Sequence, residues 1–168
     1  YFMQLMRGSA SVTRILEVWD TFSEIAEDEN PVKTIGDGSV EFDHVSFRYP
    51  ESSGNALEDI NFSIESGEIL GIIGSTGSSK STLVQLIPRL YDVTEGSVRV
   101  GRVDVRKYGI KFLRDQVAFV LQKNVLFSGT IRENMQWGNE NATDEEIIDA
   151  LKQAQAWEFV RENSTFFC

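Results

Sequence analysis

The sequence has one cysteine, one histidine and three prolines in 168 residues, and its 16 basic residues are outnumbered by 26 acidic ones. The single cysteine, Cys168, excludes a disulfide within the chain and is typical of a reducing compartment. The formal net charge of −10 argues against a nucleic-acid partner, because binding along a phosphate backbone needs a basic surface. No apolar run approaches the roughly 20 residues of a membrane span, so the chain itself is expected to be soluble and cytosolic.

The first 26 residues have the spacing of an amphipathic helix, with apolar residues near one stripe and polar residues on the opposite face. Two interpretations of this helix stay open. It either packs on the core of this domain or arrives from a domain upstream. The acidic, proline-containing stretch AEDENPVKTIGDGS, residues 26–39, then predicts a linker.

Alternating apolar residues predict β-strands from Val40 onward. The alternation changes phase near His44, which indicates a β-bulge, and we expect this histidine to be solvated rather than catalytic. A second alternating run, from Ile60 to Ile64, predicts an antiparallel partner for the first.

Two short runs are continuously apolar instead: EILGIIG, residues 68–74, and VAFVL, residues 117–121. Such runs are typical of strands that are covered on both faces, as in a parallel sheet. The other predicted elements are a helix over 83–90, a short strand over 97–100 and, behind a capping box of Thr143 and Glu146, an amphipathic helix over 147–160. Together these elements predict an α/β fold.

The stretch GSTGSSKST, residues 74–82, resembles the phosphate-binding pattern G-x-x-x-x-G-K-[ST]. It lies between a predicted buried strand and a predicted helix, and such a tight turn points successive backbone N–H groups inward. Lys80 would neutralise the β- and γ-phosphates, and Ser81 would ligate Mg²⁺. The alternative is a Gly/Ser-rich turn with a solvated lysine. The candidate nucleotide-binding residues of the loop are Gly74, Ser75, Thr76, Gly77, Ser78, Ser79, Lys80, Ser81 and Thr82.

Ser79 departs from the pattern, which has a glycine before the lysine. Glycine lets the backbone approach a ligand closely or adopt a positive φ. A Cβ here could crowd the phosphates, with about 1–3 kcal/mol of strain if the backbone is glycine-like. We therefore predict a functional but impaired loop, whose binding is weakened roughly ten- to a hundredfold.

Three ordered stretches resemble the nucleotide-binding domain of ATP-binding cassette (ABC) exporters. They are VEFDHVSFRYP, ALEDINFSIESGEILGIIGSTGSSKSTLVQLIPRLYDVTEGSV and LRDQVAFVLQKNVLFSGTIRENM. The resemblance covers residues 38–162 and is closest to half-transporters of the bacterial multidrug type. Residues 1–30 are similar to the segment that joins the last transmembrane helix to this domain, and residues 163–168 match nothing in the family. The resemblance implies an incomplete P-loop NTPase core with an antiparallel β subdomain and an N-terminal helix.

The resemblance also implies roles for residues outside the loop, with ATP and Mg²⁺ as cofactors. Tyr49 matches the aromatic residue that stacks on adenine, and a strand-end tyrosine is its structural alternative. Gln122 matches the catalytic glutamine that reaches Mg²⁺ and the attacking water, and its alternative is a polar residue that ends a strand. Leu126 and Phe127 either face the transmembrane partner or are ordinary core residues.

The implied partners are the transmembrane domain of the same transporter and a second nucleotide-binding domain, identical or different, at the cytoplasmic face of the cell membrane. After Gln122 the sequence has neither an LSGGQ motif nor an apolar strand ending in Asp-Glu, which the family needs for hydrolysis. We therefore expect the parent protein to couple ATP binding and hydrolysis to export, while this chain alone binds Mg–ATP without turnover. The alternatives are another phosphate-loop enzyme, such as a kinase or GTPase, and a non-catalytic module that binds nucleotide or a partner.

Overall fold

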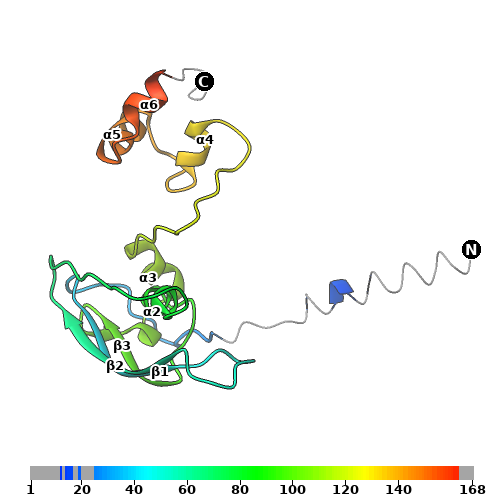
Figure 1. Cartoon of the computed structure of the whole chain (residues 1–168). Helices are drawn as coiled ribbons and strands as arrows, with labels where there is room; N and C mark the ends of the chain where they lie inside the picture. Colours follow the sequence, from blue (N-terminus) through cyan, green and yellow to red (C-terminus); the bar gives the residue numbers. More distant parts are fainter. Residues whose placement is uncertain (1–11, 13, 17–18, 20–24, 163–168) are drawn as a thin grey trace, which may run out of the picture. The chain divides into compact units, whose positions relative to one another are not determined.

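The computed structural model describes residues 12, 14–16, 19 and 25–162. The chain divides into two units, Tyr1–Ala118 and Phe119–Cys168, and each has its own hydrophobic cluster (Figure 1). Of the predicted helix over residues 1–26, Val12, Arg14–Leu16 and Trp19 are helical and exposed, Ile25 and Ala26 are not helical, and the rest lies outside the described residues. No helix in the described part has the length and apolar character that crossing a membrane takes.

The first unit contains a four-stranded antiparallel sheet with the strand order β2-β1-β3-β4. Its strands are β1 (Val40–Phe47), β2 (Leu57–Ile64), β3 (Glu95–Val100) and β4 (Val103–Asp104). Phe42 of β1 is fully buried, and its ring stacks on Phe62 of β2 with the ring centroids 4.7 Å apart. The antiparallel layer and the short strand over 97–100 are therefore confirmed.

The predicted bulge in β1 is present at His44. Between their paired residues β1 has one residue more than β3, which leaves Gly96 of β3 facing two residues of β1. His44 has a φ of 49°, and its exposed Nδ1 lies 2.7 Å from Asp59 Oδ1. This hydrogen bond raises the pKa of His44 above its usual value. The prediction of a solvated histidine is confirmed.

Between residues 25 and 118, the helices of the first unit are α2 (Lys80–Leu86), the 3-10 helix η1 (Val105–Lys107) and α3 (Ile110–Gln116). Figure 1 shows α2 and α3 on one side of the sheet. Leu83 and Leu86 of α2 and Leu113 of α3 are buried with the strands in one cluster. The helix predicted over 83–90 is confirmed in its first part but ends at Leu86, because Pro88 follows and Arg89 has a left-handed φ of 52°.

The two predicted buried strands are wrong. Residues 68–74 and 117–121 form no strand and pair with no strand of the described residues. Ile69 and Ile73 are 98% and 100% exposed, and Val120 is 84% exposed. A strand in the middle of a parallel sheet needs hydrogen-bonded neighbours on its edges, and the described part of the chain offers these two runs none.

The predicted linker, residues 26–39, is fastened to the first unit. Val32 forms a parallel bridge with Tyr108, and its N–H donates to the Lys107 carbonyl at 2.8 Å. The Lys107 ammonium group also pairs with Asp28 Oδ2 at 2.9 Å. The first part of this stretch is therefore held along the segment between η1 and α3.

The second unit consists of α4 (Ile131–Gln136), α5 (Asp144–Gln153) and α6 (Trp157–Glu162). The predicted capping box of Thr143 and Glu146 is present at α5, and Thr130 with Glu133 forms another at α4. Hydrogen bonds from the backbone and side chain of each threonine hold the pKa of its glutamate below the usual value.

The single helix predicted over 147–160 is wrong, since α5 and α6 are separate. Gln155 has a left-handed φ of 57°, and this residue lies between the two helices. The apolar periodicity still identified the core, because Ile147, Leu151 and Val160 are buried together. The helical spacing of the apolar residues continues across Gln155, so the sequence pattern does not reveal the break that the backbone conformation shows there.

Candidate functional site

Residues 74–79 form an irregular loop directly before α2. A Cβ at Gly74 would lie 2.5 Å from Ser78 Oγ, so a side chain there would displace that hydroxyl. Gly77 has a φ of 86°, which residues with a side chain rarely adopt. The N–H and the hydroxyl of Ser78 both donate to the Ser75 carbonyl, at 3.3 and 2.9 Å. The geometry of the loop therefore favours glycine at both position 74 and position 77.

The ammonium group of Lys80 is held by this loop. Its Nζ donates to the carbonyl oxygens of Gly74 and Ser75 at 2.8 and 2.7 Å and to Ser78 Oγ at 3.1 Å. A positive charge is therefore fixed where the sequence predicts phosphate binding. Neutral oxygens accept these hydrogen bonds, and charged phosphate oxygens are stronger acceptors for the same donor.

Ser79 is the N-cap residue of α2 and has φ 59° and ψ 20°. This is the left-handed conformation that glycine adopts without steric cost. The Ser79 side chain makes no capping hydrogen bond that would offset the strain. The glycine-like backbone that the sequence analysis gave as the condition for strain is thus present, at about 1–2 kcal/mol.

Tyr49 and Thr82, 33 residues apart in the sequence, are brought together. Their hydroxyl oxygens lie 2.9 Å apart. The Tyr49 ring also makes edge contacts with Phe47 and Tyr91, with ring centroids 4.8 and 5.3 Å apart. Ser81, next to Thr82 on α2, is exposed. Tyr91 lies beyond the end of α2, and no periodicity in the sequence marks it as part of this cluster.

Gln122, Leu126 and Phe127 belong to the second unit, and all three side chains are exposed. Leu126 and Phe127 are 75% and 59% exposed, so the alternative that they are core residues does not hold. The Phe127 ring stacks on Trp137, a residue that the sequence analysis did not single out, with the centroids 4.7 Å apart. The backbone N–H of Phe127 donates to Asn134 Oδ1 at 2.8 Å. This hydrogen bond ties the backbone of Phe127 to helix α4.

Comparison with known proteins assigns the chain to a family. The family described as ABC transporter matches residues 57–165. The chain belongs to this family. This ABC transporter chain is 46% identical over 161 residues to the Bacillus subtilis protein YfiB, named an uncharacterized ABC transporter ATP-binding protein. It is 44% identical over 157 residues to YgaD of the same species, whose name describes a multidrug export ATP-binding/permease protein.

The alignments cover 94% and 93% of the chain but only 27% of YfiB and of YgaD. Among solved structures, a bacterial Atm1-family ABC exporter with ATP bound matches with a TM-score of 0.85 and 28% sequence identity. That match covers 95% of this chain and 28% of the exporter chain. The predicted P-loop ATPase fold of the ABC type is therefore confirmed, and the chain spans about a quarter of the length of these relatives.

The described residues of this ABC transporter chain fit a magnesium nucleotide. The loop holds an ammonium group that can bind phosphate oxygens, and Ser81, the next residue in the sequence, supplies an exposed hydroxyl. Among the described residues, no group of three or more His, Cys, Asp or Glu side chains is placed to hold a metal ion. Mg²⁺ in nucleotide sites takes few protein ligands and keeps phosphate oxygens and waters, so this donor set suits it.

Proposed function

We propose that this chain is the ATP-binding part of an ABC exporter and that residues 74–82 bind the phosphates of Mg–ATP. The observation that carries the proposal is the Lys80 ammonium group held by the loop, with Tyr49 hydrogen-bonded to the helix that follows. Two relatives support ATP as the ligand, since YfiB is named an ATP-binding protein and the Atm1-family exporter contains ATP.

Each residue has a distinct role in this proposal. Lys80 exchanges its carbonyl contacts for the β- and γ-phosphate oxygens, and Ser81 ligates Mg²⁺ through its hydroxyl. Tyr49 offers its ring to adenine, which gives affinity without hydrogen-bond readout of the base. Gln122 would supply the side chain that the family uses to reach Mg²⁺ and the attacking water, a role that rests on the resemblance of the sequence alone. Bound ATP supplies the phosphoryl group whose transfer to water releases the free energy used in transport.

We infer that the whole protein couples the binding and hydrolysis of ATP to export across the cell membrane. The name of YgaD, which joins ATP binding with a permease, and the likeness to an exporter support this inference. The chain would lie at the cytoplasmic face, beside the transmembrane domain of the same transporter and a second nucleotide-binding domain. The exposed apolar side chains of Val125, Leu126 and Phe127 are available for the contact with the transmembrane domain.

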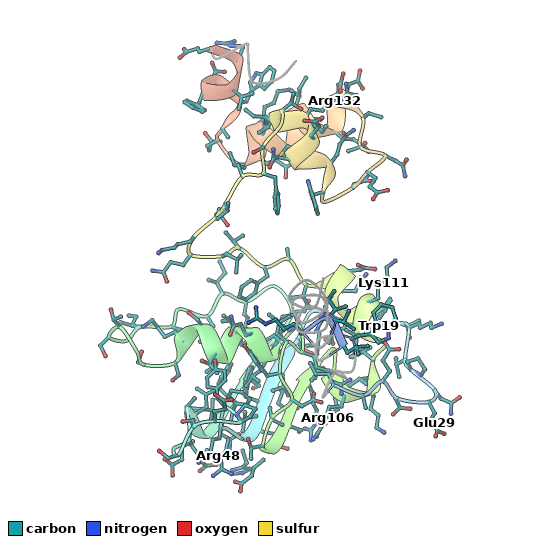
Figure 2. The ribbon with its side chains drawn as sticks, turned by 90° about the vertical axis from the view of Figure 1, so that its right-hand side faces the viewer. Trp19, Glu29, Arg48, Arg106, Lys111 and Arg132 are labelled. Atoms are coloured by element: carbon teal, nitrogen blue, oxygen red, sulfur yellow. The ribbon has the colours of Figure 1, made fainter. Side chains whose placement is uncertain are left out.

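Isothermal titration calorimetry of the 168-residue chain with Mg–ATP tests the nucleotide site. We expect Lys80→Ala to weaken binding at least about tenfold, because hydrogen bonds to charged groups contribute about 1.5–3 kcal/mol each. The matched control is Lys111→Ala, which removes an exposed lysine of α3 in the same unit (Figure 2) and should leave the affinity unchanged. The absence of heat when the unchanged chain meets millimolar Mg–ATP would refute the proposal.

Ser79→Gly is expected to tighten Mg–ATP binding roughly ten- to a hundredfold, since glycine relieves the left-handed strain and the crowding by Cβ. Ser79→Ala is the matched control, because it removes the hydroxyl but keeps both the Cβ and the strain. Calorimetry should therefore show a gain for glycine and none for alanine. Equal affinities of all three proteins would mean that Ser79 does not impair the loop.

A further inference from the structure

The ring of Tyr49 lies beyond the end of β1, where no ladder of the sheet fixes the backbone. β1 ends at Phe47, and the hydrogen bond that the Tyr49 carbonyl accepts from the described part of the chain belongs to a turn, with the N–H of Ser52 as donor at 2.9 Å. The orientation of the ring therefore depends on its side-chain contacts. These are the T-shaped contacts with the rings of Phe47 and Tyr91 and the hydrogen bond to the hydroxyl of Thr82.

The three contacts constrain the ring in different ways. The interplanar angles of 80° to Phe47 and 85° to Tyr91 are edge-to-face arrangements, and such ring contacts are less directional than a hydrogen bond. The tip is fixed by the hydrogen bond to Thr82, a side chain that is only 7% exposed. A buried partner at the tip thus adds a directional contact to the two ring contacts.

Stacking on a base does not need the tyrosine hydroxyl, because the face of a phenylalanine ring stacks as well. The role of the Tyr49 hydroxyl is therefore inferred from the residue to which it is hydrogen-bonded, Thr82. That partner lies on α2, two residues after Lys80, whose ammonium group is held by the phosphate loop. One hydrogen bond thus joins the aromatic ring to the helix that carries the phosphate-binding lysine.

We propose that Thr82 is a positioning residue: its hydroxyl orients the Tyr49 ring for the base and thereby links base binding to the phosphate loop. The inference rests on the proposed function, in which Tyr49 stacks on adenine and residues 74–82 bind phosphates. Because the two sites share a helix, a ligand with a base gains affinity from the hydrogen bond, whereas a ligand with phosphates alone gains none from the ring.

The test is a double-mutant cycle with two ligands. Calorimetry measures the binding of Mg–ATP and of magnesium tripolyphosphate, which has no base, to the full chain and to Tyr49→Phe, Thr82→Val and the double variant. The selectivity is the ratio of the ATP affinity to the tripolyphosphate affinity. We expect it to fall about two- to tenfold in each single variant, the effect of losing one hydrogen bond, and no further in the double variant.

Two further variants control for structural effects. Tyr91→Phe removes the other tyrosine hydroxyl of the same aromatic cluster and should leave the selectivity unchanged. Thr82→Ser keeps a hydroxyl and should preserve the selectivity. If Thr82→Val does not fold, Tyr49→Phe with these two controls still decides the question.

The possible failures can be told apart. An unchanged selectivity in Tyr49→Phe, or losses that add in the double variant, would overturn the inference and leave the proposed nucleotide site intact. If the unchanged chain binds tripolyphosphate as tightly as ATP, the ring makes no contribution to a base and the inference is likewise overturned. If it binds neither ligand, the proposed function fails, and the inference fails with it.

Discussion

Replacing Arg89 with alanine is expected to lower the free energy of unfolding of the first unit by about 3–5 kcal/mol, the loss typical of removing one partner from a buried ion pair. The Arg89 side chain is only 3% exposed, and its guanidinium group makes two hydrogen bonds to the Asp92 carboxylate, at 2.6 and 2.9 Å. Without the guanidinium group, the Asp92 carboxylate, which is 32% exposed, would be left without its charged partner.

The same guanidinium group also joins two segments that are distant in the sequence. It donates to the carbonyl of Ala26 in the linker at 2.9 Å and to that of Arg106 (labelled in Figure 2) at 3.4 Å. Alanine at this position would leave both carbonyls without this donor. Because arginine and alanine meet similar strain at a φ of 52°, the expected loss reports the side-chain contacts and not the backbone.

Arg99→Ala is the matched control for this prediction. Arg99 also pairs with two carboxylates, Glu41 and Asp43, at 2.9 and 3.0 Å, but its side chain is 35% exposed. Exposed ion pairs contribute about 0–1 kcal/mol, so the loss should be several times smaller. Urea unfolding, monitored through the hydrogen exchange of amides in β1 and α2, measures the free energy of unfolding of the first unit alone. Equal losses for the two variants would contradict the assignment of Arg89 as the buried anchor.

The antiparallel layer could be predicted from the sequence because its signal is local. Alternation along β1 and β2 gives each strand one buried face, and the phase change near His44 marks the bulge. The capping box of Thr143 and Glu146 is local in the same sense, since both partners lie within one helical turn. The loop before Lys80 was predictable from its own glycine-containing pattern and from the helix after it, although the strand predicted before it does not form.

The failures have a different physical origin. Residues 68–74 and 117–121 have the composition of buried strands, but composition does not supply the neighbours that hydrogen-bond such strands. The anchoring role of Arg89 was not predicted either, because a charged residue after a helix usually lies on the surface. Its partners at Ala26 and Arg106 are contacts between distant segments, and periodicity carries no information about them.

The network around Arg89 also bears on the proposed function. Arg114 on α3 donates to the carbonyls of Pro88 and Arg89, at 3.2 and 2.8 Å, so two arginines hold the turn that follows α2. The linker is tied to the same turn through the Ala26 carbonyl. The start of the linker is therefore fastened to the turn that follows the helix beginning with Lys80.

Gly96→Ala is expected to destabilise the first unit by about 2–5 kcal/mol, because strain and backbone overlap add at this position. Gly96 has a φ of 77°, and a Cβ there would lie 2.2 Å from the His44 carbonyl oxygen and 2.4 Å from that of Asp43. Both atoms belong to the backbone of the bulge in β1 and cannot rotate away as the end of a side chain can. Relief would require β1 and β3 to separate, and β1 leads directly to Phe47 and Tyr49.

Gly67→Ala separates the two contributions. Gly67 has a similar φ of 87°, but a Cβ there meets no atom within 4 Å, so only the cost of the left-handed backbone, about 1–2 kcal/mol, should remain. Thermal unfolding of the first unit, followed by the exchange of β1 amides, measures both variants. If the loss in Gly96→Ala did not exceed that in Gly67→Ala, the close approach of β3 to the bulge would not stabilise the sheet. A larger loss confined to Gly96→Ala, together with weaker Mg–ATP binding, would mean that the bulge sets the position of the chain that carries Tyr49.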